Sequence, residues 1–230
     1  MSNDIEAYTN DLCKNHIHKK IYFEKYFKGC KRILDIGCGR GNFIQFAPDK
    51  IEGCDNGLRM LKIAKERRFN VKFVNIRKRL PYPDNTFDAI NLKEVIEHLT
   101  YPMEVIKECY RILKPKGKLV ILTPDVSRLG VEAFYNALGH TSPFTKESVR
   151  SILVFNKFKE VNVVRWQPYV FGVNTLFGKG YLPMWIYNLF EKLILERFGK
   201  EVVGVGYKRG GTNGLESFVA NCGREKKAKE

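Results

Sequence analysis

The chain has 230 residues, of which 44% are hydrophobic and 28% are charged, a length and composition that suit one folded domain and exclude an intrinsically disordered chain. Lysine and arginine number 40 against 25 acidic residues, and the net charge of +15 favours polyanions such as RNA, or an anionic membrane surface, as partners. Asp4 and Glu6 exclude a signal peptide, and no stretch reaches the roughly 18 apolar residues of a membrane span, so we expect a cytoplasmic protein.

The predicted elements alternate between strands and helices after a helical lead-in. Residues 5–28 mix aromatic and charged residues at helical spacing, and residues 32–36 form an apolar strand that leads into a glycine turn and a helix from about Asn42. Further strands are predicted at 51–54, 71–74, 87–92 and 118–123, and further helices at 57–68 and 101–113. This alternation predicts an α/β fold with a doubly wound, mostly parallel sheet covered on both faces.

The pattern changes after Pro124. A helix is predicted at 146–154, and the sixth and seventh strands at 160–165 and 217–222. Apolar residues between 184 and 198 fall at helical spacing, which predicts an aromatic helical insertion over 169–210. The insertion packs on its own domain, covers a substrate as a lid, forms a dimer surface or contacts a membrane. We expect a single domain, with lead-in helices over 1–29 and a ligand-binding core over 30–165.

The glycine turn after the first strand predicts a ligand site, because ligands of open α/β sheets bind at the carboxyl ends of the strands. The turn reads Asp35-Ile36-Gly37-Cys38-Gly39-Arg40-Gly41, and its glycines let the backbone approach a ligand closely. A dinucleotide fingerprint requires a third glycine at position 42, where this chain has Asn42. A carboxylate at Asp35 is also unfavourable beside a pyrophosphate and favourable beside an ammonium group, which argues against a nicotinamide-dependent oxidoreductase.

Two further strand ends carry polar residues. The second strand ends at Asp55, whose carboxylate can accept hydrogen bonds from both hydroxyls of a ribose. The third strand ends at Asn75, whose amide can pair with an adenine edge or simply form a turn. The sequence therefore predicts a nucleoside-containing ligand.

Five ordered segments resemble the motifs of class I S-adenosylmethionine-dependent methyltransferases, in particular the methyltransferase type 11 group around the ubiquinone O-methyltransferases. They are DIGCGRG, Asp55, LPYPDNTFDAI, EVIEHL and RILKPKGKLVILTPD, and the resemblance covers roughly residues 30 to 165. It implies that the cofactor is S-adenosylmethionine, with Asp35, Gly37, Cys38 and Gly39 at the methionine part, Asp55 and Asn56 at the ribose, Asn75 and Ile76 at the adenine, and the Lys93 carbonyl at the amino group. The family usually has aspartate at the position of Asn75.

The segment from Glu94 to His98 holds the candidate catalytic residues. A helix there places Glu94, Glu97 and His98 on one face, and His140 lies in the loop after the fifth strand. Two carboxylates and two imidazoles can coordinate a divalent cation, as similar groups do in some relatives. Alternatively, Glu97 and His98 cap and orient a helix, and His98 or His140 acts as a metal-free general base.

The resemblance implies an enzyme that transfers a methyl group to a hydroxyl, or less favourably an amine, of a small molecule. Because of the net positive charge, an RNA 2′-O-methyltransferase is an alternative hypothesis for the function. A non-catalytic cofactor-binding protein is the alternative from another functional class. The expected partner is a small-molecule acceptor, and the net positive charge is also compatible with a peripheral membrane contact.

Overall fold

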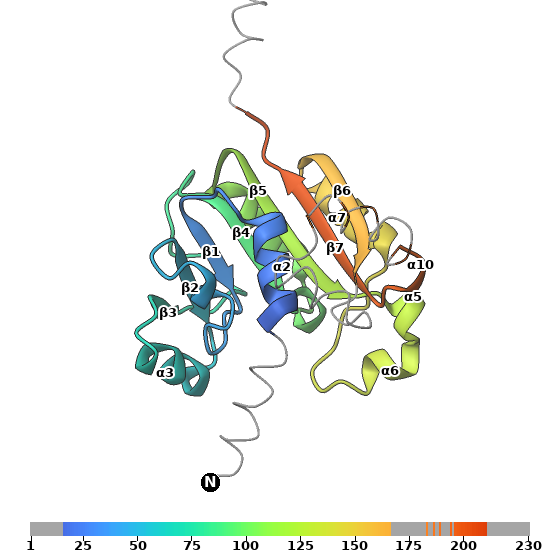
Figure 1. The fold of residues 1–230 in the computed structure, drawn as a ribbon, viewed down its shortest axis with the longest axis horizontal. Helices are drawn as coiled ribbons and strands as arrows, with labels where there is room; N and C mark the ends of the chain where they lie inside the picture. Colours follow the sequence, from blue (N-terminus) through green and yellow to red (C-terminus); the bar gives the residue numbers. More distant parts are fainter. Residues whose placement is uncertain are drawn as a thin grey trace, which may run out of the picture.

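A computed structural model describes residues 16–166 and 196–210, together with four isolated positions (Pro183, Ile186, Leu189 and Ile194). These residues form a seven-stranded sheet in the order β3-β2-β1-β4-β5-β7-β6, in which only β7 runs antiparallel to its neighbours. In Figure 1 the sheet extends across the molecule from β3 on the left to β6 on the right, and helix α2 lies in front of it. The predicted doubly wound α/β fold is confirmed.

The strands lie close to the predicted positions. Their bounds are β1 Ile33–Ile36, β2 Ile51–Asp55, β3 Val71–Phe73, β4 Phe87–Lys93, β5 Leu113–Pro124, β6 Lys159–Trp166 and β7 Glu201–Tyr207. The helices are α2 His16–Tyr26, α3 Leu58–Glu66, α4 Pro102–Ile112, α5 Val126–Leu129, α6 Val131–Tyr135, α7 Lys146–Phe155 and α10 Glu196–Phe198, with short 3-10 turns at η1 Ile44–Phe46 and η2 Ile96–His98. No helix in this described part is long and apolar enough to cross a membrane.

Alternation along the strands sends side chains to two cores, one on each face of the sheet. Leu34 and Ile36 of β1 join the core that α4 and α7 cover. Ile33 belongs to the core on the opposite face, where α2 contributes Ile21 and Tyr22. By the same alternation, Asp35 of β1 lies on the α2 face, among apolar side chains.

The position of the seventh strand corrects the sequence-based prediction. The strand beside β5 is β7, which lies inside the 169–210 segment predicted as an insertion. The predicted strand at 217–222 and most of the predicted amphipathic helix lie outside the described residues. Gly204 and Gly206 obscured this strand, since glycine disfavours strands. Both are needed, because an added Cβ would lie 2.5 Å from Val149 Cγ1 at the first and 2.8 Å from Phe158 Cβ at the second.

The predicted helix from Asn42 is also wrong. The glycine turn is followed only by the three-residue 3-10 turn η1. Pro48 explains this, because the residue before a proline avoids the helical region, and Ala47 has φ −159° and ψ 70°. The site after β1 is therefore a glycine turn without a long helix behind it.

Candidate functional site

The glycine turn after β1 has the conformation that its sequence requires. Gly37, Gly39 and Gly41 have φ values of 75°, 51° and 77°, which favour glycine. A Cβ added to Gly37 would lie only 2.5 Å from Val95 Cγ2. The backbone of the turn is fixed by β2, since Gly37 N–H donates to the Cys54 carbonyl at 2.8 Å.

Asp55 at the end of β2 ties this turn to the start of α3. One carboxylate oxygen accepts a hydrogen bond from Gly39 N–H at 2.8 Å, and the other accepts from Gly57 N–H at 2.7 Å. Each carboxylate oxygen has further lone-pair capacity, so ribose hydroxyls can still be accepted. Asp55 thus has a structural role in the turn beside the predicted binding role.

Two adjoining hollows open at the carboxyl edge of the sheet. The first, a cavity of about 380 Å³, is lined by predicted methionine-site residues and others, including Asp35, Gly37, Cys38, Gly39 and Lys93. The second, of about 230 Å³, is lined by residues predicted for the ribose and adenine, including Asp55, Asn56 and Ile76. Gly37 and Glu94 line both hollows, so one extended ligand can occupy them together.

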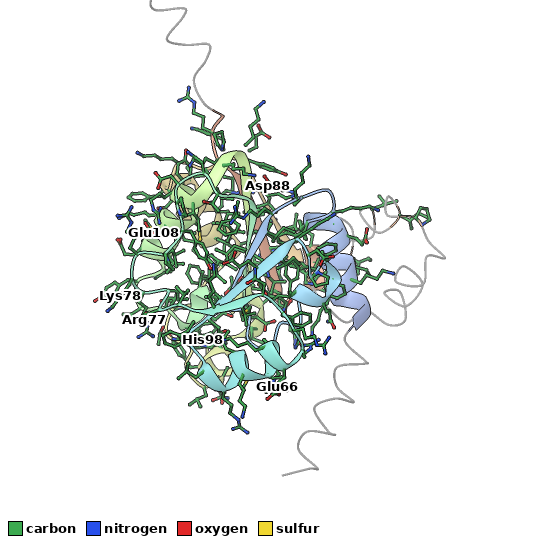
Figure 2. The ribbon with its side chains drawn as sticks, turned by 90° about the vertical axis from the view of Figure 1, so that its left-hand side faces the viewer. Glu66, Arg77, Lys78, Asp88, His98 and Glu108 are labelled. Carbon is green, nitrogen blue, oxygen red and sulfur yellow. The ribbon has the colours of Figure 1, made fainter. Side chains whose placement is uncertain are left out.

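Asn75 does not line either hollow. Its side-chain oxygen accepts a hydrogen bond from Arg77 N–H at 3.1 Å, which is the turn arrangement considered as its alternative role. Arg77 itself lines the second hollow, beside Ile76 and His98. Figure 2 places Arg77 and His98 toward the lower side of the molecule and Asp88, near the start of β4, toward the upper side.

The methionine end of the site is strongly charged. Burial raises the pKa of Asp35 to about 7, although the hydrogen bond from Asn91 and the charge of Lys93 lower it. Lys93 forms an ion pair with Glu94. Burial opposes the charge of Lys93, but Glu94 and Glu201 raise its pKa, whereas burial raises the pKa of Glu201 itself to about 7. A buried carboxylate such as Asp35 is a favourable partner for a ligand ammonium group.

The segment from Glu94 to His98 is not the helix that the sequence predicted. Only residues 96–98 form a turn, the 3-10 segment η2, and Glu94 has φ 56°, in the left-handed region that a right-handed helix cannot use. The shared helical face of Glu94, Glu97 and His98 is therefore wrong. The carboxylate of Glu94 pairs with Lys93 instead.

Glu97, His98 and His140 nevertheless come together. One ligand atom from each of the three lies within 4.8 Å of the other two, and Glu94 is outside this group. The loop that carries His140 is docked by backbone hydrogen bonds, because Thr141 N–H and Ser142 N–H donate to the Glu97 carbonyl at 2.8 Å and 3.0 Å. This docking brings the imidazoles of His98 and His140 to a centroid distance of 4.8 Å.

The hydrogen bonds of the two imidazoles orient their other ring nitrogens. His98 Nδ1 lies 3.0 Å from the Gly139 carbonyl oxygen, and His140 Nδ1 lies 2.9 Å from the Phe134 carbonyl oxygen. Since a carbonyl only accepts, each Nδ1 carries the proton and each Nε2 keeps a lone pair in the neutral imidazole. Both histidines can therefore accept a proton or a metal through Nε2.

Glu97 offers one unused oxygen to this cluster. The Thr123 hydroxyl donates to Glu97 Oε2 at 3.0 Å, whereas the buried Oε1 has no hydrogen-bond partner. Burial raises the pKa of Glu97, and its hydrogen bonds and His98 lower it. An unpartnered buried carboxylate oxygen in a cluster with two imidazoles can take a cation or a proton.

Sequence reasoning missed several residues that line or influence the two hollows. Lys19 and Tyr22 of α2 and Asn91 of β4 line the first hollow, and Glu201 at the start of β7 acts electrostatically on Lys93. Asn91 carried a usable signal, because a lone amide inside the apolar strand FDAINLK needs a buried partner.

The fold and site together define a doubly wound domain with two adjoining hollows beside a carboxylate–imidazole cluster. Residues 34–121 match the family model described as a methyltransferase domain. This match, together with the methyltransferases among the similar proteins, supports assignment of the chain to the class I S-adenosylmethionine-dependent methyltransferase family.

Similar proteins agree with this assignment. An uncharacterized methyltransferase of Schizosaccharomyces pombe is 33% identical over 123 residues (46% of this chain and 44% of the relative), and a demethylmenaquinone methyltransferase of Symbiobacterium thermophilum is 29% identical over 118 residues (46% and 47%). The chain thus spans about half the length of the curated relatives it matches. A crystal structure of a methyltransferase from Archaeoglobus fulgidus, dependent on S-adenosylmethionine, has the same fold, with a TM-score of 0.64 at 24% identity (84% of this chain and 93% of that chain).

Proposed function

We propose that the protein transfers a methyl group from S-adenosylmethionine to a hydroxyl group of a small molecule. One observation carries the proposal: His98 of the carboxylate–imidazole cluster lines the same hollow as Asp55 and Ile76. Groups able to remove a proton thus lie beside the predicted ribose and adenine contacts. A binding module without catalysis has no need of this cluster.

The chain's own residues fit the cofactor. Asp35 offers a carboxylate to its ammonium group, Asp55 offers lone pairs to the ribose hydroxyls, and the glycine turn leaves room for close backbone approach. When bound, the cofactor supplies a methyl group that is attached to a positively charged sulfonium sulfur. The acceptor oxygen bonds to the methyl carbon as the carbon–sulfur bond breaks, and the sulfur is left as a neutral thioether. The hollows hold the acceptor and cofactor together, and this positioning contributes to the rate.

The cluster of Glu97, His98 and His140 removes the acceptor's proton. A hydroxyl is a poor nucleophile until its proton leaves, and the Nε2 lone pair of either histidine can accept it. The carbonyl partners of both Nδ1 atoms fix the rings in the tautomer that this role needs.

The proposal extends to a divalent cation at the same cluster. Glu97 Oε1 and the two imidazole Nε2 atoms would hold it, since mixed oxygen and nitrogen ligands suit several cations. The spacing of one ligand atom from each of these three residues and the unpartnered Oε1 support this group of residues. The chemistry supplied there is polarisation of the acceptor hydroxyl.

A carbon acceptor is the second candidate. Its support is the similarity to demethylmenaquinone methyltransferases. Removing the proton of an aromatic hydroxyl makes the neighbouring ring carbon nucleophilic, so the same cluster serves a quinol-like acceptor. The net charge of +15 supports RNA as a third.

The experiment is a transfer assay with S-adenosylmethionine labelled in its methyl group, run against hydroxylated aromatics, quinols and short RNAs. Label in an O-methyl product of a small molecule is expected. A C-methyl product would transfer the proposal to a carbon acceptor, and label only in RNA would overturn the small-molecule acceptor. Tight calorimetric binding of NAD without binding of S-adenosylmethionine would overturn the function as a whole.

Calorimetry with Mn²⁺ tests the cation separately. Wild-type protein is expected to bind the ion, and the isosteric Glu97→Gln variant to bind it at least about tenfold more weakly, since a buried carboxylate ligand is lost. Glu104→Gln, on the exposed side of α4, is the matched control. Unchanged activity after exhaustive chelation, with no Mn²⁺ binding, would leave the histidines as metal-free bases.

A further inference from the structure

A chain of three polar side chains is buried beneath α2. The Tyr22 hydroxyl donates to Asn91 Oδ1 at 2.9 Å, and Asn91 Nδ2 donates to Asp35 Oδ1 at 2.7 Å. Their exposed fractions are 2%, 0% and 3%. The three residues come from α2, β4 and β1, and Asp35 and Asn91 are register partners in neighbouring strands. All three line the first hollow.

The direction of these hydrogen bonds gives Tyr22 a specific effect. A phenol that donates to the amide oxygen of Asn91 requires the amide NH₂ to face Asp35. Without the phenol, the amide can rotate by half a turn and present its oxygen to the carboxylate. Two facing acceptors repel each other, so the Tyr22 hydroxyl selects the amide orientation that supports Asp35.

The hydroxyl of Tyr22 is separable from the packing of its ring. The ring contacts Phe27, Phe43 and Trp166 at centroid distances of 5.7 Å, 6.1 Å and 6.3 Å. Phenylalanine at this position keeps those contacts. The packing role and the hydrogen-bonding role can therefore be tested independently.

The hydrogen bond from Asn91 engages one carboxylate oxygen of Asp35, so the other oxygen can accept from a ligand. The Asp35 side chain lines the cavity that extends to Lys93 and Glu94. The charged and titratable groups around this cavity come from several elements. They are Tyr22 and Lys19 of α2, Cys38 and Arg40 of the turn, Cys54 and Asp55 of β2, Lys93 at the end of β4, Glu94, and Glu201 of β7.

We propose that Tyr22 and Asn91 are positioning residues for cofactor binding, which hold Asp35 with its second carboxylate oxygen toward the ammonium group of the cofactor. Helix α2, outside the segment that matches the family model, then forms part of the cofactor site. The inference rests on the proposed function, because the cofactor supplies the ammonium group. It adds a specific contribution from the lead-in helix to the methionine end of the site.

The electrostatics of Asp35 give the inference a pH signature. Burial raises the pKa of Asp35 to about 7, and the hydrogen bond from Asn91 counteracts that rise. Loss of this bond favours the protonated acid, which attracts an ammonium group less strongly. A variant that lacks this hydrogen bond should therefore require a higher pH for cofactor binding than the wild type does.

The test uses Tyr22→Phe and calorimetric titration with S-adenosylhomocysteine, the demethylated product, between pH 6 and 8.5. The variant is expected to bind about five- to tenfold more weakly at pH 7, the equivalent of one hydrogen bond, with the binding curve displaced to higher pH. Tyr26→Phe, one turn further along α2, is the matched control. A purely structural role would lower thermal stability without displacing the pH curve.

Asn91→Leu provides a second variant of similar size. It removes both the acceptor for Tyr22 and the donor to Asp35, so it should weaken binding at least as much as Tyr22→Phe. If wild-type protein binds S-adenosylhomocysteine and both variants bind it with unchanged affinity and pH dependence, the positioning role is wrong. A wild-type protein that binds no S-adenosylhomocysteine would overturn the proposed function, and the inference with it.

Discussion

Asp35→Asn should stabilise the ligand-free protein at neutral pH. Burial raises the pKa of Asp35 from 3.8 to about 7. Between those values the folded protein keeps a proton that the unfolded chain has released, so the free energy of unfolding falls as pH rises. Asparagine has no charge to bury, and its side-chain oxygen can still accept the hydrogen bond from Asn91 Nδ2.

The magnitude follows from the size of the shift. Each pH unit is worth about 1.4 kcal/mol, so about three units give a difference of up to about 4 kcal/mol between variant and wild type. The difference should grow from pH 4 to pH 7 and stay constant above that. Glu201, whose pKa burial also raises to about 7, is present in both proteins and cancels in the comparison.

Urea unfolding followed by circular dichroism at a series of pH values measures this difference. Asp49→Asn, on the exposed surface, is the control for removing one negative charge. The same Asp35→Asn variant should bind S-adenosylhomocysteine more weakly than wild type, because the partner of the ammonium group is lost. If the difference in the free energy of unfolding is independent of pH, or is largest near pH 4, the raised pKa of the buried Asp35 carboxyl is wrong.

Three further predictions concern the turn and the cluster. Asp55→Ala should weaken cofactor binding by about 1.5–3 kcal/mol in calorimetry, since it removes hydrogen bonds to a charged group, and normal binding would contradict the ribose role. Gly37→Ala should lower the free energy of unfolding more than Gly39→Ala, because a Cβ at the first position meets Val95 Cγ2 at 2.5 Å and one at the second meets nothing within 4 Å; equal losses in urea unfolding would contradict this. His140→Ala should slow methyl transfer by about 10²–10⁴-fold in initial-rate assays, as expected for a lost general base or ligand, while cofactor affinity stays unchanged; an equal loss of affinity would place it in the cofactor site instead.

The sequence alone determined the fold class, and it predicted residues that line the two hollows at the strand ends. The positions of five parallel strands and the glycine turn are encoded locally, in apolar runs and in residues that favour a left-handed backbone. Asp35 and Asp55 could be placed because strand ends in a parallel sheet meet at one edge. These inferences need only the order and spacing of nearby residues.

The tertiary structure decided which distant side chains meet. Tyr22 and Asn91 lie 69 positions apart, and their hydrogen bond exists only because α2 packs on the β1 and β4 face. Glu94 left the predicted cluster because its backbone adopts a left-handed conformation, a choice made by packing at the strand end rather than by helical propensity. His140 joined it through backbone hydrogen bonds to Glu97, which no periodicity encodes. Contacts of this kind depend on how whole helices and strands pack against one another, and that packing is determined by the hydrophobic core as a whole.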